Sequence, residues 1–128
     1  MPFSYQLDPS RHMVLSRAWG VLIDEDIEAH YARLAADPGF DPSFRQLCNL
    51  MDVTRIDTSA EALRRLAQRS IFSAGTRRAL VAAQDAHYGL SRMFKVFCEI
   101  EGSLVEVFRD TASAEAWLEL GAVRRQLR

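Results

Sequence analysis

Four side chains near the middle of the chain could bind an anion or accept a phosphate. They are Asp52, Asp57, Thr58 and Ser59, and they lie between an apolar run and a segment with helical spacing. A hydroxyl at the start of a helix lies at the positive end of the helix dipole, where a phosphate is stabilised. We therefore interpret these four residues as a candidate regulatory or partner-binding site. The plainer interpretation makes Ser59 a tolerated polar residue without a role.

The spacing of Thr58 and Glu61 is typical of a capping box. In that arrangement the Thr58 hydroxyl accepts a hydrogen bond from the backbone N–H of Glu61, and the Glu61 carboxylate reaches back to the cap residue. Ser59 then occupies the first helical position, where its hydroxyl is not needed for the cap. We therefore expect the Ser59 side chain to point to solvent.

A second polar group, Asp85, His87 and Tyr88, follows a later apolar run. A histidine near an aspartate and a serine is the composition of a hydrolase triad. The sequence has no Gly-x-Ser-x-Gly nucleophile elbow, and a helix N-terminus disfavours the imidazolium that a triad must form. We expect Asp85 to cap the helix and His87 to be a surface or half-buried residue, so we predict that the chain is not an enzyme.

The next helical segment carries an apolar stripe at helical spacing, formed by Leu90, Met93, Phe94 and Phe97. Such a stripe usually belongs to the core, but an aromatic wall with few polar groups also suits a hydrophobic ligand. The ligand hypothesis requires an enclosed cavity between this helix and the sheet. Its candidate pocket residues are Asp85, His87, Tyr88, Met93, Phe94 and Phe97. The connector 70–75 could form a lid over such a pocket or a dimer contact.

Alternating strand and helix patterns position these residues. Strands are expected at residues 3–7, 13–18, 44–51, 78–83 and 104–108, and helices at 24–36, 60–68, 86–99 and from Asp110 to a C-cap at Gly121. Trp19 and Gly20 are expected to close an opening hairpin, and a short acidic turn is expected after Met51. The order β-β-α-β-α-β-α-β-α predicts one α/β domain over residues 1–128, with a mostly parallel sheet, an antiparallel edge strand and flanking helices.

The segment Ile56-Asp57-Thr58-Ser59 resembles the Ile/Met-Asp-Ser-Ser motif of STAS domains, the anti-sigma-factor antagonist class. Those domains share the predicted order of strands and helices. The resemblance implies a non-enzymatic regulatory module in which Ser59 stands in the position phosphorylated by a partner kinase. Ala60 replaces the glycine that follows the motif. The rest of the chain looks more like a bacterial STAS-like branch that is related in fold to CRAL-TRIO lipid-binding domains.

Composition excludes several other classes of protein. A net charge of −1 gives no electrostatic reason to bind nucleic acid. The sequence has no secretory signal pattern and no apolar run of the roughly 20 residues that a membrane helix needs, so we expect a cytoplasmic protein without membrane insertion. Cys48 and Cys98 lack CxxC spacing, which predicts buried free thiols and neither a metal site nor a cofactor.

Two function classes therefore stay open. The first is a regulatory module that binds a protein partner, a kinase or another regulatory protein, through residues 52–59. The second is a carrier or sensor of a small hydrophobic, lipid-like ligand. A homodimer is also expected, because small α/β domains commonly carry an exposed edge strand.

Overall fold

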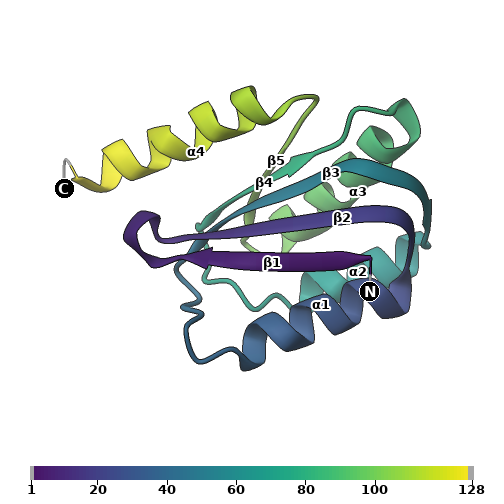
Figure 1. Ribbon diagram of the computed structural model, residues 1–128, viewed down its shortest axis with the longest axis horizontal. Helices are drawn as coiled ribbons and strands as arrows, with labels where there is room; N and C mark the ends of the chain where they lie inside the picture. The colour runs from purple at the N-terminus through teal and green to yellow at the C-terminus, as the bar shows by residue number, and fades with distance from the viewer. Residues whose placement is uncertain (1, 127–128) are drawn as a thin grey trace.

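The part of the chain that the structure describes forms one sheet of five strands, whose spatial order follows their order in the sequence (Figure 1). The computed structural model describes the backbone of residues 2–126 and the side chains of residues 2–120. The strands are β1 (Phe3–Asp8), β2 (Met13–Ile23), β3 (Arg45–Asp57), β4 (Arg77–Val81) and β5 (Leu104–Phe108). Strand β1 is antiparallel to β2, and every later pair is parallel. The predicted α/β fold with an antiparallel edge is confirmed.

Three helices lie on one face of this sheet, and a fourth lies on the other (Figure 1). The helices are α1 (Asp24–Ala36), α2 (Ala60–Gln68), α3 (Asp85–Ile100) and α4 (Thr111–Gln126), with a short 3-10 turn η1 (Pro9–Arg11) between β1 and β2. Each of α1, α2 and α3 connects a strand to its parallel neighbour, always in the same direction across the sheet. Because such crossovers are right-handed, all three must share one face. Helix α4 follows β5 and packs mainly over β4 from the opposite side.

Strands β2 and β3 are longer than the sequence predicts. Trp19 and Gly20 do not close the hairpin but lie inside β2, where the pairing with β3 shifts at a bulge. Gly20 has a φ of +67°, a conformation that glycine adopts without a steric penalty. Strand β3 continues past Met51, because its backbone stays paired with β2 as far as Asp57. The expected acidic turn after Met51 is therefore wrong, and these residues belong to a strand.

Two predicted helix boundaries are also wrong. The N-cap of α3 is Gln84, and Asp85 is the first helical residue. Helix α4 continues through Gly121 to Gln126, so Gly121 is not its C-cap. A glycine inside a helix costs only about 1 kcal/mol relative to alanine, which a helix docked on a sheet can absorb.

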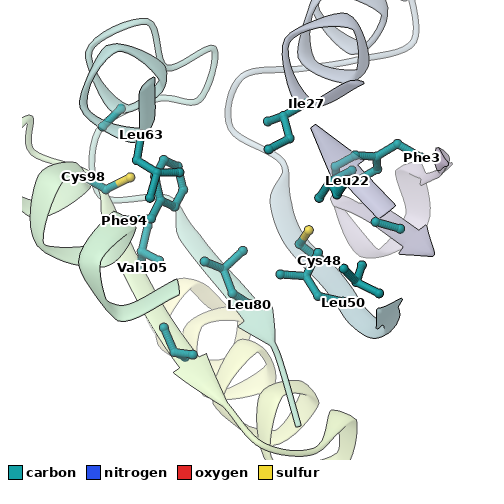
Figure 2. Packing of buried hydrophobic residues seen from close by; sticks show 14 residues of the cluster. Phe3, Leu22, Ile27, Cys48, Leu50, Leu63, Leu80, Phe94, Cys98 and Val105 are labelled. Atoms are coloured by element: carbon teal, nitrogen blue, oxygen red, sulfur yellow. The ribbon is translucent and has the colours of Figure 1, made fainter. Parts of the chain in front are cut away.

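Apolar side chains fill both faces of the sheet. On the α4 side the buried cluster consists of Met13, Leu47, Ala79, Val81, Ala114 and Leu118. On the α1–α3 side a larger cluster includes Phe3, Leu22, Ile27, Cys48, Leu50, Leu63, Leu80, Phe94, Cys98 and Val105 (Figure 2). Both cysteines are buried and free, as the sequence predicts.

The α1–α3 face is not evenly covered. Helix α1 contacts mainly β1 and β2, whereas α3 contacts mainly α2 and β5. Figure 2 shows the consequence: Leu63 and Phe94 stand on one side of an opening, and Ile27 and Leu22 stand on the other. The middle strands β3 and β4 therefore form the floor of a space between two groups of helices.

Candidate functional site

An apolar cavity occupies this space between the helices and the sheet. The centre of a water molecule can occupy about 60 Å³ of it, and the empty volume is about 500 Å³ when the part open to solvent is included. One water molecule needs only ~10–15 Å³ of the volume that water centres can occupy, so the cavity has room for several water molecules. Its walls are Phe3, Leu22, Ile27, Tyr31, Cys48, Leu50, Ile56, Thr58, Leu63, Leu66, Leu80, Leu90, Ser91 and Phe94.

The alternation of side chains along the strands builds the floor of the cavity. On β3, Cys48 and Leu50 point to this face, and Leu80 does so on β4, opposite Cys48 in the parallel register. Residues two apart on a strand share a face, so the apolar floor follows directly from the sequence. The walls come from three helices that do not close over it.

Thr58 places a polar atom in this apolar wall. Its Oγ1 is buried and has no hydrogen-bond partner in the described part of the chain. The residue also lines a smaller hollow between α1 and α2, together with Asp24, Ile27, Glu28, Ala62, Leu63 and Leu66. Thr58 therefore stands where the cavity continues toward the surface between these two helices.

Ser59, not Thr58, caps helix α2. The Ser59 Oγ accepts a hydrogen bond from the backbone N–H of Ala62 at 3.1 Å, and Ser59 has extended backbone dihedrals. The predicted capping box of Thr58 and Glu61 is therefore wrong. The reason is the length of β3, which delays the helix by one residue and turns the Thr58 side chain inward. Ser59 is exposed, as expected, but its hydroxyl oxygen is engaged by the cap.

Asp52 and Asp57 are exposed carboxylates on the extended part of β3. An Nη2 of Arg17 on β2 lies 2.8 Å from Asp52, and an Nη2 of Arg55 lies 2.6 Å from Asp57. Exposed pairs of this kind contribute little to stability. Asp57 directly precedes Thr58 and Ser59, whereas Asp52 lies further back along the strand.

The polar group at the start of α3 lies apart from the cavity walls. Asp85 is exposed and accepts a hydrogen bond from Arg109 at 2.7 Å, and the same guanidinium lies 4.0 Å from the centre of the Tyr88 ring. His87 has only 5% of its surface exposed, because it lies on the inward face of α3, so the expectation of a surface or half-buried histidine is wrong. None of Asp85, His87 and Tyr88 lines the cavity.

Of the predicted apolar stripe, Leu90 and Phe94 line the cavity, whereas Met93 and Phe97 do not. Met93 is 39% exposed, and Phe97 is partly buried beneath the Arg64 guanidinium, 5.2 Å from its ring centre. The face of α3 that turns inward consists of His87, Ser91, Phe94 and Cys98. The helix is thus rotated relative to its most apolar stripe, so small and polar residues share the inner face.

A buried polar network, which the sequence analysis does not single out, adjoins the cavity. Gln46 donates from Nε2 to the Ser16 Oγ at 3.1 Å and to the Tyr31 hydroxyl at 3.3 Å. The Ser16 Oγ lies 3.1 Å from the His30 Nε2. Arg78 donates from Nε to the Gln46 Oε1 and from Nη2 to the Tyr31 hydroxyl, both at 3.2 Å. The sequence does contain a sign of this network: a polar residue interrupts each of three apolar strands, Ser16 in β2, Gln46 in β3 and Arg78 in β4.

The network lies at the amino ends of β3 and β4. The register pairs Val14 with Gln46 and Gln46 with Arg78. The Gln46–Arg78 pair lies two residues before the Cys48–Leu80 pair of the apolar floor, on the same face of the sheet. The carboxyl ends of the strands, where ligands usually gather in such sheets, hold the exposed Asp57, Ser59 and Asp85 together with the half-buried Thr58 and the buried His87. Of the network residues, Tyr31 lines the cavity, so the network lies beside one end of the apolar body.

Burial shifts the titration of this network. Desolvation, with a smaller effect from Arg33, lowers the pKa of His30 to about 4, so the imidazole is neutral at pH 7. Burial likewise raises the pKa of Tyr31, and it raises the pKa of Cys48 to about 12 and of Cys98 to about 11. At neutral pH, none of these four groups carries a charge.

Within residues 2–126, no three His, Cys, Asp or Glu side chains gather in a way that could hold a metal ion. Nor does that stretch contain a helix with the length and apolar character needed to cross a membrane.

The strand order and the placement of the helices define the protein as one with a SpoIIAA-like α/β fold. Its structure is similar to that of an uncharacterised DUF3478-family protein with a SpoIIAA-like fold from Shewanella loihica PV-4. The two share 19% sequence identity with a TM-score of 0.62, over 91% of this chain and 93% of the other. No protein-family model and no curated protein matches the sequence. The likeness confirms the predicted STAS-like fold, whereas the relation to CRAL-TRIO domains stays a prediction.

Proposed function

We propose that the protein is a non-enzymatic module that binds a small hydrophobic ligand between α1, α2, α3 and the sheet. The single observation that supports this function best is the apolar cavity, because packed protein interiors seldom leave room for several water molecules. Most of the wall residues are apolar side chains, but together they leave an unfilled volume. A ligand would restore the lost contacts.

The position of the cavity also connects it to the predicted regulatory segment. Thr58 lines the cavity wall. Ser59 is the N-cap of α2, and this helix contributes Leu63 and Leu66 to the same wall. A ligand that holds α2 in place therefore alters the exposed surface around Asp57 and Ser59. In this proposal the ligand is the signal, and a protein partner reads that surface.

The experiment uses N-phenyl-1-naphthylamine, an uncharged fluorophore that brightens in apolar sites. We expect saturable binding to the wild-type protein with a Kd of roughly 1–50 μM, a range typical of an apolar pocket without optimised polar contacts. Leu66→Trp should fill the space between α1 and α2 and weaken binding about tenfold or more. Leu66 is suited to this role because it is only partly buried and lines the cavity.

The matched control is Arg65→Trp, which puts the same indole on the exposed side of α2. Its Kd should stay within about twofold of the wild-type value, because Arg65 does not line the cavity. If the wild-type protein gives no saturable signal, or if both variants weaken binding equally, the hydrophobic-ligand function is rejected.

A second function, a partner-binding switch at Ser59, is favoured by the exposure of this serine at a helix N-terminus. A phosphate there would gain from the dipole of α2 and from the free N–H groups of its first turn. Intact-mass and peptide mass spectrometry of the protein from its native host should then find phosphate on Ser59. Phosphate confined to other residues under every growth condition would reject this switch.

A further inference from the structure

We infer that the ligand of the cavity is an amphiphile with a carboxylate head, and that Arg78 is the group that binds this head. The inference rests on the proposed function and adds the chemical class of the ligand. It starts from a charge that the protein buries without a counterion.

Arg78 is 3% exposed, yet no carboxylate of the described residues lies within salt-bridge distance of it. The groups that it hydrogen-bonds are neutral: the amide of Gln46, the hydroxyl of Tyr31 and the thiol of Cys98. Guanidinium groups stay protonated in proteins, so the positive charge cannot be removed by titration. A buried charge is normally paired, which makes an unpaired arginine a pointer to a missing anion.

The titratable groups that face Arg78 do not supply that anion. Burial raises the pKa values of Tyr31, Cys48 and Cys98, and the positive charge of Arg78 acts in the opposite direction on each of them. Burial outweighs this effect in each case, so the phenol and both thiols keep their protons at neutral pH. The neighbours therefore solvate the charge but do not neutralise it.

Aromatic rings offset part of the free-energy cost of burying the Arg78 charge. The Arg78 guanidinium carbon lies 4.4 Å from the ring centre of Phe72 and 5.7 Å from that of Phe94. Such contacts favour a cation, but they carry no net negative charge. Phe94 also lines the cavity, so one ring touches both the charge and the apolar body of the site.

A small polar hollow lies beside Arg78 and adjoins the large cavity. Its walls are Tyr31, Leu66, Arg69, Ser70, Ile71, Phe72 and Arg78, of which Tyr31 and Leu66 also line the cavity. The centre of a water molecule can occupy about 10 Å³ of it, which is room for about one water or for one oxygen of a headgroup. The Ser70 Oγ accepts from the backbone N–H of Phe72 and so retains its own proton to donate. This hollow offers a carboxylate two arginines and a hydroxyl, next to room for its apolar tail.

The experiment compares octanoate with 1-octanol, which share a tail and differ in charge, by isothermal titration calorimetry at pH 7.5. We expect the wild-type protein to bind the acid about tenfold or more tightly than the alcohol, because charge-assisted hydrogen bonds are roughly twice as strong as neutral ones. In Arg78→Met the acid-to-alcohol affinity ratio should fall to about one or below.

A second variant decides the matter if Arg78→Met fails to fold. Gln46→Glu places a carboxylate of the protein itself where the Gln46 Oε1 lies 3.2 Å from Arg78. It should supply the missing counterion, keep or raise the melting temperature, and also reduce the affinity ratio to about one.

The outcomes separate this inference from the function on which it rests. A ratio near one in the wild-type protein overturns the carboxylate head and leaves the hydrophobic-ligand function intact. A high ratio that survives both substitutions overturns the role of Arg78. If the wild-type protein binds the fluorophore but neither of these compounds, the carboxylate head alone is overturned; if it binds none of the three, both proposals are rejected.

Discussion

Buried polar residues on the α1 side of the sheet carry the most information about this molecule at the residue scale. Ser16, His30, Gln46 and Arg78 are each less than 6% exposed, and they hydrogen-bond to one another or to Tyr31. A fully apolar core would be simpler and often as stable. Their placement beside a cavity is the reason that we propose a ligand-binding role for Arg78, with Gln46 and Tyr31 as its hydrogen-bond partners.

His30 makes the stability of the protein depend on pH. It stacks on Phe3 with ring centres 3.8 Å apart, and burial lowers its pKa to about 4 from an ordinary value of 6.5. Because the unfolded chain binds the proton more tightly, stability is complete above about pH 6.5 and is lost as the pH falls toward 4. We expect His30 to remove about 2 kcal/mol of unfolding free energy between pH 7 and pH 4.5.

Urea unfolding at the two pH values measures this loss, and His30→Phe is the control. The variant keeps an aromatic ring against Phe3 but cannot take up a proton. It should be somewhat less stable at pH 7, because the Ser16 hydroxyl loses one of its two partners and keeps only Gln46, and it should lose about 2 kcal/mol less than wild type on acidification. Equal acid losses in the two proteins would show that His30 does not titrate as stated.

At the element scale, the boundary between β3 and α2 decides what Thr58 and Ser59 can do. The strand pattern turns Thr58 into the cavity wall, and the next residue becomes the cap. A phosphate on Ser59 would therefore replace a capping hydroxyl, instead of adding to a free first-turn residue. The sequence pattern of a capping box predicts that a serine or threonine caps the helix. Where β3 ends decides whether that residue is Thr58 or Ser59.

Substitutions at these two adjacent residues should have opposite effects on stability. Ser59→Ala removes the cap and should lower the unfolding free energy by about 1 kcal/mol. Thr58→Val replaces a buried, unpaired hydroxyl by a methyl of the same shape and should cause no loss, with a gain of up to about 1 kcal/mol. Chemical denaturation of both variants tests the assignment, and a destabilising Thr58→Val beside a neutral Ser59→Ala would restore the capping box.

Helix α3 shows a second limit at this scale. Its apolar residues spread over more than one face, so periodicity alone predicts one inward stripe of Leu90, Met93, Phe94 and Phe97, of which Leu90 and Phe94 line the cavity. Contacts with α2 and β5 instead turn Ser91, Phe94 and Cys98 inward. Tertiary packing thus sets the rotation of the helix, and it leaves Met93 at the surface.

At the scale of the whole molecule, the sequential strand order produces the cavity. It forces α1, α2 and α3 onto one face, where they divide into two groups above β3 and β4 (Figure 1). The other face receives α4 and a compact apolar cluster. The homodimer, the protein partner and the cytoplasmic location stay predictions.

The sequence by itself determined the alternation of strands and helices, the antiparallel edge and the burial of Cys48 and Cys98. These features depend on hydrophobic periodicity and turn residues, which are local along the chain. Only the tertiary structure decided that Ser59 is the cap, that Met93 and Phe97 do not line the cavity, and that Arg78 is buried beside Gln46 and Tyr31. Each of these depends on how elements far apart in the sequence pack, because an unfilled volume or an unpaired charge exists only between them.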